Sequence, residues 1–139
     1  MIHYIITGHG EFSTGLLNAL EMIAGKQENL TIIPFKEGDA LEAYQANLAE
    51  RLENNPSGEG HIFFTDLLGG TPYKTCVSLS LMKENCYVLS GTNLGMFLEG
   101  VALRTFMDDP KTLCETIKGS GKDNIEYFTK PMIEEEVAI

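Results

Sequence analysis

A histidine between two glycines is the first residue of this sequence whose setting suggests chemistry. His9 stands in Gly8-His9-Gly10, directly after an apolar segment at residues 2–7. An imidazole can act as a nucleophile near neutral pH when a partner holds one of its ring nitrogens. The small neighbours would leave the ring open to a bulky reactant. A lone histidine after a strand is more often a surface loop residue, so His9 needs a partner to count as a site.

Asp66 is the candidate partner, because it follows the apolar segment 61–65 as His9 follows the first one. A carboxylate that accepts the proton of one imidazole nitrogen fixes the tautomer and leaves the other nitrogen free to attack. The next residues, Gly69-Gly70-Thr71-Pro72, are typical of a helix start, whose N–H groups and dipole favour an anion such as a phosphoryl group. Thr71 could also add its hydroxyl, although its plainer role is to cap the helix. Asp66 could equally brace its own loop, and the glycines could simply form a turn.

Other site chemistries find no support in the sequence. Neither G-x-x-x-x-G-K-[ST] nor G-x-G-x-x-G occurs, so nucleotide binding is not indicated, and no G-x-S-x-G elbow suggests a serine hydrolase. His9 and Asp66 are too few ligands for a metal, and nothing is spaced to join them. His3 and His61 fall within predicted strands, where structural or exposed roles are expected. We therefore expect no metal and no cofactor.

The elements that must position these residues alternate regularly along the chain. Strands are predicted where short, β-branched-rich apolar runs occur, and helices where apolar residues recur every three or four positions. The predicted strands are residues 2–7, 30–35, 61–65 and 86–89, with a weak last strand at 125–128. The first two predicted helices run from Ser13 to just before Gly25, and from Asp39, with Glu42 completing a capping box, to near residue 53. The other three run from Thr71 to just before the fourth strand, from Met96 to Phe106, and from Asp109 to near Gly119.

This alternation predicts the fold class. Parallel strands need a long crossover, and a helix of ten or more residues supplies it. We expect a three-layer, doubly wound, mainly parallel α/β sheet in flavodoxin-like strand order. In that order the first and third strands flank a switch point, where sites form beyond the carboxyl ends of the strands. His9 and Asp66 would then face one another across the crevice.

Composition limits the class of protein. The 139 residues suit one domain, expected at 1–130 with an acidic tail at 131–139, and 43% hydrophobic with 22% charged residues is ordinary for a globular chain. A net charge of -10 argues against nucleic acid as a partner. No apolar run is long enough to cross a bilayer and no export signal is visible, so a cytoplasmic location is expected. The cysteines Cys76, Cys86 and Cys114 suggest neither a disulfide framework nor a zinc site.

With these residues in view, the chain resembles the IIA components of mannose-family phosphotransferase systems. The resemblance rests on a first strand ending in Thr7-Gly8-His9-Gly10, on Asp66, and on the following Leu67-Leu68-Gly69-Gly70-Thr71-Pro72. The segment Gly91-Thr92-Asn93-Leu94-Gly95-Met96 is similar to the family's G-x-N-x-x-M turn. The chain departs from the family pattern at Thr71, where serine is common, and at Lys74, where an asparagine is common.

The resemblance implies a mechanism and partners. His9 would receive a phosphoryl group from the phosphocarrier protein HPr and pass it to a IIB component, with Asp66 orienting the ring. The membrane components IIC and IID would be indirect partners and would choose the sugar. The family fold is a homodimer in which a C-terminal strand is exchanged between subunits, and residues 125–128 would be that strand here.

Two other functions share this architecture. The chain could be the phosphoryl-donor subunit of a dihydroxyacetone kinase, although the Gly8-His9-Gly10 loop and the Gly69-Gly70-Thr71-Pro72 segment favour the sugar system. It could also be a non-catalytic regulatory module of the same fold. An intact His9 and Asp66 argue against that reading.

Overall fold

A parallel four-stranded sheet forms the centre of the protein. The computed structural model describes residues 1–131, and its strands are β1 (His3–His9), β2 (Leu30–Phe35), β3 (His61–Phe64) and β4 (Cys86–Leu89). Their order is β2-β1-β3-β4, and all three neighbouring pairs are parallel. The order reverses direction between β1 and β3, so the carboxyl ends of these two strands form the switch point.

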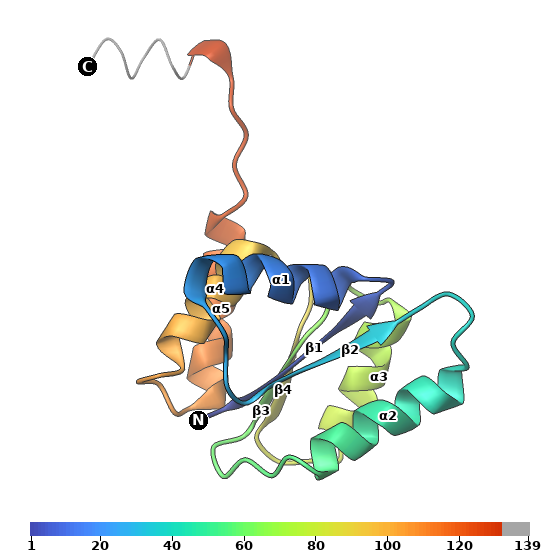
Figure 1. Cartoon of the computed structure of the whole chain (residues 1–139). Helices are drawn as coiled ribbons and strands as arrows, with labels where there is room; N and C mark the ends of the chain where they lie inside the picture. The colour runs from blue at the N-terminus through green and yellow to red at the C-terminus, as the bar shows by residue number, and fades with distance from the viewer. Residues whose placement is uncertain (132–139) are drawn as a thin grey trace.

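Helices cover both faces of this sheet (Figure 1). One layer contains α1, α4 and α5, and the other contains α2 and α3. The helices span α1 (Phe12–Ala24), α2 (Leu41–Glu53), α3 (Thr71–Ser80), α4 (Leu94–Leu103) and α5 (Pro110–Asp123). The fold is therefore the expected three-layer α/β architecture in flavodoxin-like strand order.

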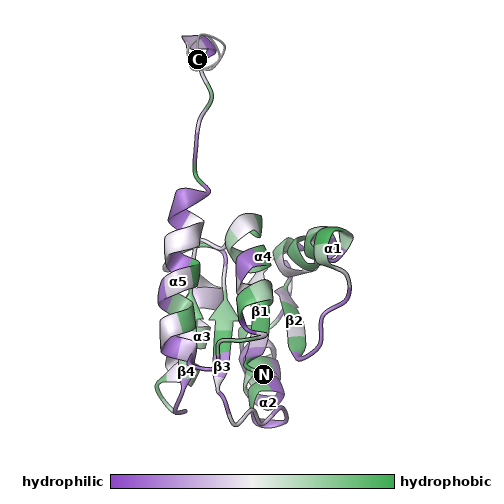
Figure 2. Cartoon of the chain, turned by 90° about the vertical axis from the view of Figure 1, so that its left-hand side faces the viewer, coloured by the Kyte–Doolittle hydropathy of each residue, from purple (hydrophilic) through white to green (hydrophobic). Residues whose placement is uncertain are grey.

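Each face of the sheet has its own hydrophobic core, because alternate side chains of a strand point to opposite faces. Tyr4 and Ile6 of β1 pack under the α1, α4 and α5 layer, together with Phe64 and Phe97. Ile5 packs on the other face, under α2 and α3. Figure 2 shows hydrophobic colour in the strands that carry these side chains and hydrophilic residues distributed along α5. These two cores hold the ends of β1 and β3 rigidly side by side.

Several predicted helix starts were wrong by a few residues. Ser13 does not cap α1, which begins at Phe12, and the Ser13 side chain is buried. Asp39 does not cap α2 either, because its carboxylate instead accepts the Lys36 backbone N–H at 2.7 Å in the preceding turn. Helix α3 begins at Thr71 itself, with Gly70 as its N-cap.

The predicted limits of the last two helices were also wrong. Helix α4 starts earlier than Met96, after Asn93, whose side chain accepts the Met96 N–H at 3.0 Å, and it ends at Leu103. Helix α5 begins after Asp109, as predicted, but it continues past Gly119 to Asp123. A Cβ at Gly121 would lie 2.6 Å from the Met96 sulfur, so this glycine permits close packing of α5 on α4 and does not end the helix.

The predicted strand at 125–128 is absent from the described chain. These residues follow α5 without regular structure, and Figure 1 shows them extending away from the body of the protein. A strand requires a neighbour to pair with, and this segment pairs with none among residues 1–131. The expected acidic tail falls almost wholly on residues 132–139, which lie outside the described residues.

His3 and His61 meet in the sheet, near the amino ends of β1 and β3. Both are buried, their Nδ1 atoms lie 3.0 Å apart, and His3 Nε2 lies 2.9 Å from the Thr31 hydroxyl. Burial lowers the pKa of each imidazole to about 4, helped at His3 by the charges of His61, Arg104 and Arg51 and at His61 by that of Lys83. Of the structural and exposed roles expected for these residues, the structural one is correct.

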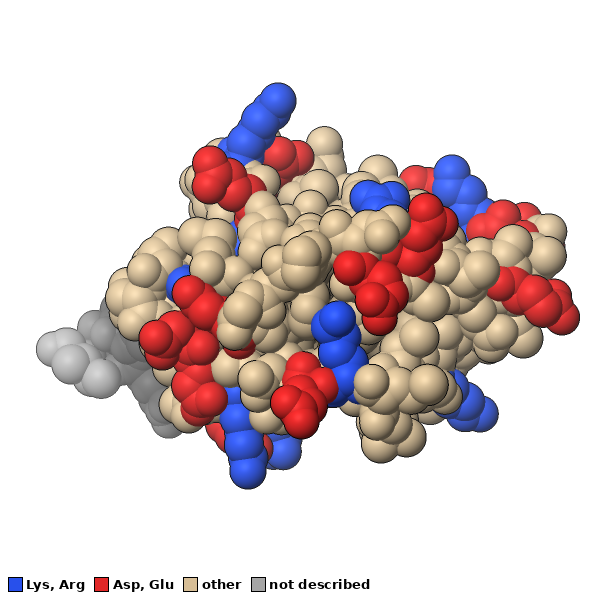
Figure 3. Space-filling model, turned by 90° about the horizontal axis from the view of Figure 1, so that it is seen from below, with Lys and Arg blue, Asp and Glu red and all other residues tan. Residues whose placement is uncertain are grey.

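Charge is spread over the surface without a dominant patch on the face that Figure 3 shows. Acidic and basic side chains alternate there with uncharged surface. Within residues 1–131, none of the helices combines the length and apolar content that a membrane span requires.

Candidate functional site

The structure brings His9 and Asp66 into direct contact at the carboxyl end of the sheet. His9 is the last residue of β1, and Asp66 follows β3. The His9 Nδ1 and the Asp66 Oδ2 are 2.8 Å apart, and the same oxygen accepts the His9 backbone N–H at 2.8 Å. One carboxylate oxygen therefore fixes both the backbone and the ring of His9.

These contacts determine which ring nitrogen is free. Burial alone would raise the pKa of the Asp66 carboxyl, but the hydrogen bonds from the His9 backbone and ring outweigh it and lower that pKa. Asp66 is thus a carboxylate at neutral pH and can only accept, which places the His9 proton on Nδ1. The Nε2 lone pair remains available, and the His9 side chain is 47% exposed whereas that of Asp66 is 16% exposed.

Two glycines make this arrangement sterically possible. A Cβ at Gly8 would lie 3.0 Å from the Asp66 carboxyl carbon and 2.7 Å from the Phe12 ring. A Cβ at Gly70 would lie 2.9 Å from the His9 Cε1. Gly8 therefore allows Asp66 to approach β1, and Gly70 allows the imidazole ring to lie against the start of α3. Sequence reasoning had assigned the glycine beside His9 only to reactant access, so its role toward Asp66 was missed.

The start of α3 lies against the imidazole ring. The ring carbon nearest a Cβ built at Gly70 is Cε1, which is bonded to both ring nitrogens. Gly69 takes a left-handed backbone with φ 81°, and the Gly70 N–H bonds to the Leu67 carbonyl at 3.0 Å. The Thr71 and Tyr73 N–H groups make no hydrogen bond within the described residues. A helix terminus with free N–H groups can hold an anion.

A second aromatic residue borders the imidazole. Phe35 ends β2 opposite His9 in the parallel register, and the two ring centroids are 6.3 Å apart in an edge-on arrangement. Tyr44 stacks on Phe35 at 4.4 Å and places its hydroxyl 2.6 Å from that of Thr7. Sequence reasoning missed Phe35, although the β1 and β2 register could have placed it beside His9.

Apolar side chains are exposed beside the site. Leu67 and Leu68 are 63% and 69% exposed in the loop after Asp66. Phe12 is half-buried, because one edge of its ring lies close to Gly8. Met96, in contrast, is buried against Gly121 and does not contribute to this surface.

Fold and site together define a class: a flavodoxin-like α/β protein that presents a carboxylate-oriented imidazole at its switch point. Residues 3–118 match the family model EIIA-man, described as the PTS system fructose IIA component. The fructose-specific EIIA component of Bacillus subtilis (strain 168) is 34% identical over 130 residues, which are 94% of this chain and 88% of that protein. The chain belongs to the mannose-type family of phosphotransferase system IIA components.

Other relatives agree with this assignment. The mannose-specific EIIAB component of Escherichia coli (strain K12) is 31% identical over 78% of this chain, and the chain spans only 33% of its length. A crystal structure of the EIIA component from Streptococcus agalactiae superposes with a TM-score of 0.85 at 35% identity, covering 92% of this chain and 98% of that one. These matches favour the sugar phosphotransferase system over a dihydroxyacetone kinase subunit or a regulatory module.

Proposed function

We propose that the protein is a phosphohistidine carrier that accepts a phosphoryl group on the Nε2 of His9. The observation that carries the proposal is the 2.8 Å contact between His9 Nδ1 and Asp66 Oδ2. It holds the proton on Nδ1 and leaves the Nε2 lone pair exposed at the carboxyl edge of the sheet. A phosphotransferase role follows from the family, and the named residues are our assignment within it.

The transfer step uses His9 and Asp66 in distinct roles. The Nε2 lone pair attacks the phosphorus of the donor, and the bond to the donor's leaving atom breaks with its electrons returning to the donor. Once the N–P bond has formed, the imidazole ring carries a positive charge that is delocalised over both nitrogens, including the protonated Nδ1. The Asp66 carboxylate faces that charge and stabilises it, as carboxylates do beside imidazolium in other nucleophilic sites.

Gly69, Gly70 and Thr71 would hold the phosphoryl oxygens. The Thr71 N–H, which makes no hydrogen bond within the described residues, and the positive end of the α3 dipole belong to the helix start that lies against the His9 ring. Anions at such termini gain about 0.3–1 kcal/mol from the dipole, and more where they are partly buried. This gain would partly offset the repulsion between the negatively charged phosphoryl group and a protein whose net charge is already -10.

The partners follow from the family. We propose that HPr donates the phosphoryl group, that a IIB component accepts it, and that IIC and IID take part only through IIB. The exposed Leu67 and Leu68 beside His9 offer apolar surface on which such partners could dock in turn. The protein would act in the cytoplasm, where sugar uptake delivers its product, with residues 1–130 as the carrier domain and an acidic tail after it.

A homodimer is the proposed assembly. Strand β4 is an edge strand that pairs only with β3 among the described residues. Residues 125–128 have no regular structure, and Ile125, Tyr127 and Phe128 are 77%, 73% and 67% exposed. Exchange of this segment between subunits would pair the open edge and bury these side chains together.

Transfer of label tests the proposal. The protein is incubated with labelled phosphoenolpyruvate and the two general phosphotransferase proteins, and acid-labile, alkali-stable label is measured on the chain. We expect label on the native protein and none on His9→Ala, whereas the double variant His3→Leu with His61→Leu serves as a control that keeps His9. Label that persists in His9→Ala, or never appears on the native protein, would overturn the proposal.

A further inference from the structure

The Asp66 carboxylate that orients His9 has no second side chain to hold it in place. Within residues 1–131 its Oδ2 bonds to the His9 ring and backbone, and its Oδ1 is buried without a hydrogen-bond partner. Strand β3 ends at Phe64, so Asp66 also lies beyond the regular strand. The direction of this carboxylate therefore depends on how the backbone around Asp66 is held.

The loop after β4 holds that backbone. The Gly91 N–H donates to the Asp66 carbonyl at 2.6 Å, and the Thr92 N–H donates to the Thr65 carbonyl at 3.1 Å. The Thr92 hydroxyl donates to the same Thr65 carbonyl at 2.7 Å. Thr65 is fully buried and Thr92 is 7% exposed, so little water competes for these bonds. Two consecutive residues of one loop thus bind two consecutive carbonyls of the other.

These bonds fix both peptide planes that flank the Cα of Asp66. A peptide unit is planar, so the Thr65 carbonyl sets the plane before Asp66 and the Asp66 carbonyl sets the plane after it. The two planes together determine the φ and ψ angles of Asp66, and hence the direction in which its side chain leaves the backbone. The loop after β4 therefore aims the carboxylate at His9.

The same loop is anchored on its other side. The Asn93 side chain accepts the Met96 N–H at 3.0 Å at the start of α4 and donates to the Gly121 carbonyl of α5 at 2.9 Å. Gly91 has a left-handed backbone with φ 64°, which a turn directly after β4 can use without a steric cost. Thr92 therefore lies in a loop that is fixed to the sheet at one end and to two helices at the other.

The Thr92 hydroxyl is not needed merely to satisfy a buried carbonyl. The Thr65 carbonyl already accepts the Thr92 N–H, so loss of the hydroxyl would leave no orphaned acceptor. A second donor on the same oxygen instead restricts the direction of the carbonyl, because its two lone pairs lie in the peptide plane. The hydroxyl therefore contributes to the orientation of this peptide plane.

We propose that Thr92 is a positioning residue that acts through Asp66. Its hydroxyl fixes the peptide plane before Asp66, so that the carboxylate holds the His9 proton on Nδ1 and leaves the Nε2 lone pair free. The inference rests on the proposed carrier function and adds to it a residue that makes no hydrogen bond to the imidazole within the described part of the chain.

Thr92→Val tests the inference, because it keeps the β-branched shape and the backbone N–H and removes only the hydroxyl. In ¹⁵N NMR of the unphosphorylated protein at about pH 8, where an ordinary imidazole is neutral, native His9 should be in the Nδ1–H form. Thr92→Val should populate the Nε2–H form as well. The initial rate of His9 phosphorylation should fall about tenfold, less than the roughly 100-fold that a misplacement of about 1 Å can cost. Thr92→Ser restores a hydroxyl and should return both readouts to their native values.

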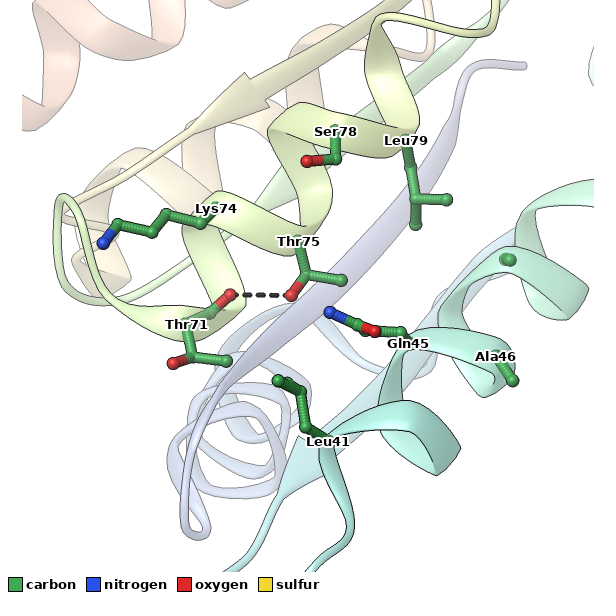
Figure 4. A pocket seen from close by; sticks show the side chains of 9 residues that line it. Leu41, Gln45, Ala46, Thr71, Lys74, Thr75, Ser78 and Leu79 are labelled. Atoms are coloured by element: carbon green, nitrogen blue, oxygen red, sulfur yellow. Dashed lines mark hydrogen bonds between the residues drawn. The ribbon is translucent and has the colours of Figure 1, made fainter.

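Thr75→Val is the matched control. Thr75 is also 7% exposed, and its hydroxyl also donates to a backbone carbonyl, that of Thr71 at 2.8 Å, but within α3 (Figure 4). This variant loses one buried hydroxyl bond without changing the peptide planes that flank Asp66, so His9 should keep the Nδ1–H form. Similar losses of unfolding free energy in Thr75→Val and Thr92→Val would show that a loss of stability does not by itself shift the tautomer.

The His9 tautomer decides the inference. An unchanged tautomer in folded Thr92→Val would overturn it, and so would an equal shift of the tautomer in Thr75→Val or in Thr92→Ser. If Thr92→Val does not fold, Thr92→Ala removes the same hydroxyl and is judged by the same readout. The tautomer is measured before any phosphoryl transfer. A native chain that never accepts a phosphoryl group would therefore contradict the carrier function, while the NMR result would still decide whether Thr92 positions Asp66.

Discussion

At the scale of single residues, the site depends on Gly70 as much as on its polar side chains. Asp66 fixes the rotation of the His9 ring through Nδ1, and Gly70 provides the space that this rotation requires. The ring is thus held on one edge by a hydrogen bond and on the other by contact with the start of α3. Any side chain at position 70 would compete with the imidazole for the same space.

Gly70→Ala should slow phosphorylation of His9 about tenfold while leaving the fold intact. Its Cβ would lie 2.9 Å from His9 Cε1, so the ring must turn and lengthen its bond to Asp66. Tenfold corresponds to about 1.4 kcal/mol in the barrier. Initial rates of phosphoryl transfer measure the effect, and Gly15→Ala is the control, because a Cβ there meets nothing within 4 Å. Equal rates for the Gly70→Ala and native proteins would show that ring position is not limiting.

Asp66→Asn should slow transfer on the order of 100-fold, within the range for groups that manage a proton in catalysis. The amide preserves size but supplies no negative charge opposite the imidazolium that forms on phosphorylation. The stability of the phosphohistidine, followed as its hydrolysis half-life, should fall in the same variant. Urea unfolding establishes whether the change is confined to chemistry. A variant that transfers at the native rate would remove Asp66 from the mechanism.

At the scale of elements, the alternation of strands and helices was predictable and their limits were less so. All four strands were predicted within two residues at each end, because short β-branched runs leave little ambiguity. Helix starts depended on tertiary contacts instead. Gly121 resembles a helix terminator in the sequence, but its contact with Met96 makes it a packing residue within α5.

The candidate site was predictable as a pair but not as a geometry. Two polar residues after two apolar strands, together with the switch-point rule, sufficed to bring His9 and Asp66 together. The sequence could not reveal that one Asp66 oxygen binds both the His9 ring and its backbone, nor that Phe35 lies edge-on to the imidazole. These features depend on strand register and side-chain rotamers, which have no local sequence signal.

The buried His3 and His61 pair should make the sheet sensitive to acid. Both pKa values are about 4 in the folded protein and near 6.5 when unfolded. The unfolded chain therefore binds protons first, and the stability present above pH 6.5 is lost as the pH falls toward 4. The loss should be on the order of 3 kcal/mol for each histidine.

Urea unfolding between pH 7.5 and 4.5 measures this loss. The double variant His3→Leu with His61→Leu removes both imidazoles together, so neither ring is left facing an apolar side chain, and the same variant with Thr31→Val also removes the hydroxyl that contacts His3. It should show a flatter dependence of unfolding free energy on pH than the native chain does. Acid-sensitive carboxylates such as Asp66 and Asp109 are common to both proteins, so they cancel in the comparison. Parallel pH curves would contradict a role for the histidine pair.

At the scale of the whole molecule, the exposed segment after α5 is the feature that one chain does not explain. A run with three exposed large apolar side chains is costly in water. Strand exchange between two copies would remove that cost and cover the β4 edge.

Tyr127→Ser with Phe128→Ser should therefore convert a dimer into a monomer, as measured by sedimentation or light scattering. Substituting Met22→Ser and Ile23→Ser, which are also exposed but lie on α1, should leave the dimer intact. A native chain that is monomeric at micromolar concentration, or a serine variant that remains dimeric, would refute strand exchange. Because His9 lies on β1, the monomer should still accept a phosphoryl group.

The central claim is that His9 carries the phosphoryl group on the ring nitrogen that Asp66 leaves free. The most direct test is long-range ¹H–¹⁵N NMR of the phosphorylated, ¹⁵N-labelled protein, which distinguishes substitution at Nε2 from substitution at Nδ1. The geometry predicts a phosphoryl group on Nε2 of His9 and a protonated Nδ1 hydrogen-bonded to Asp66. Phosphorylation at Nδ1 of His9, or at another residue, would contradict it.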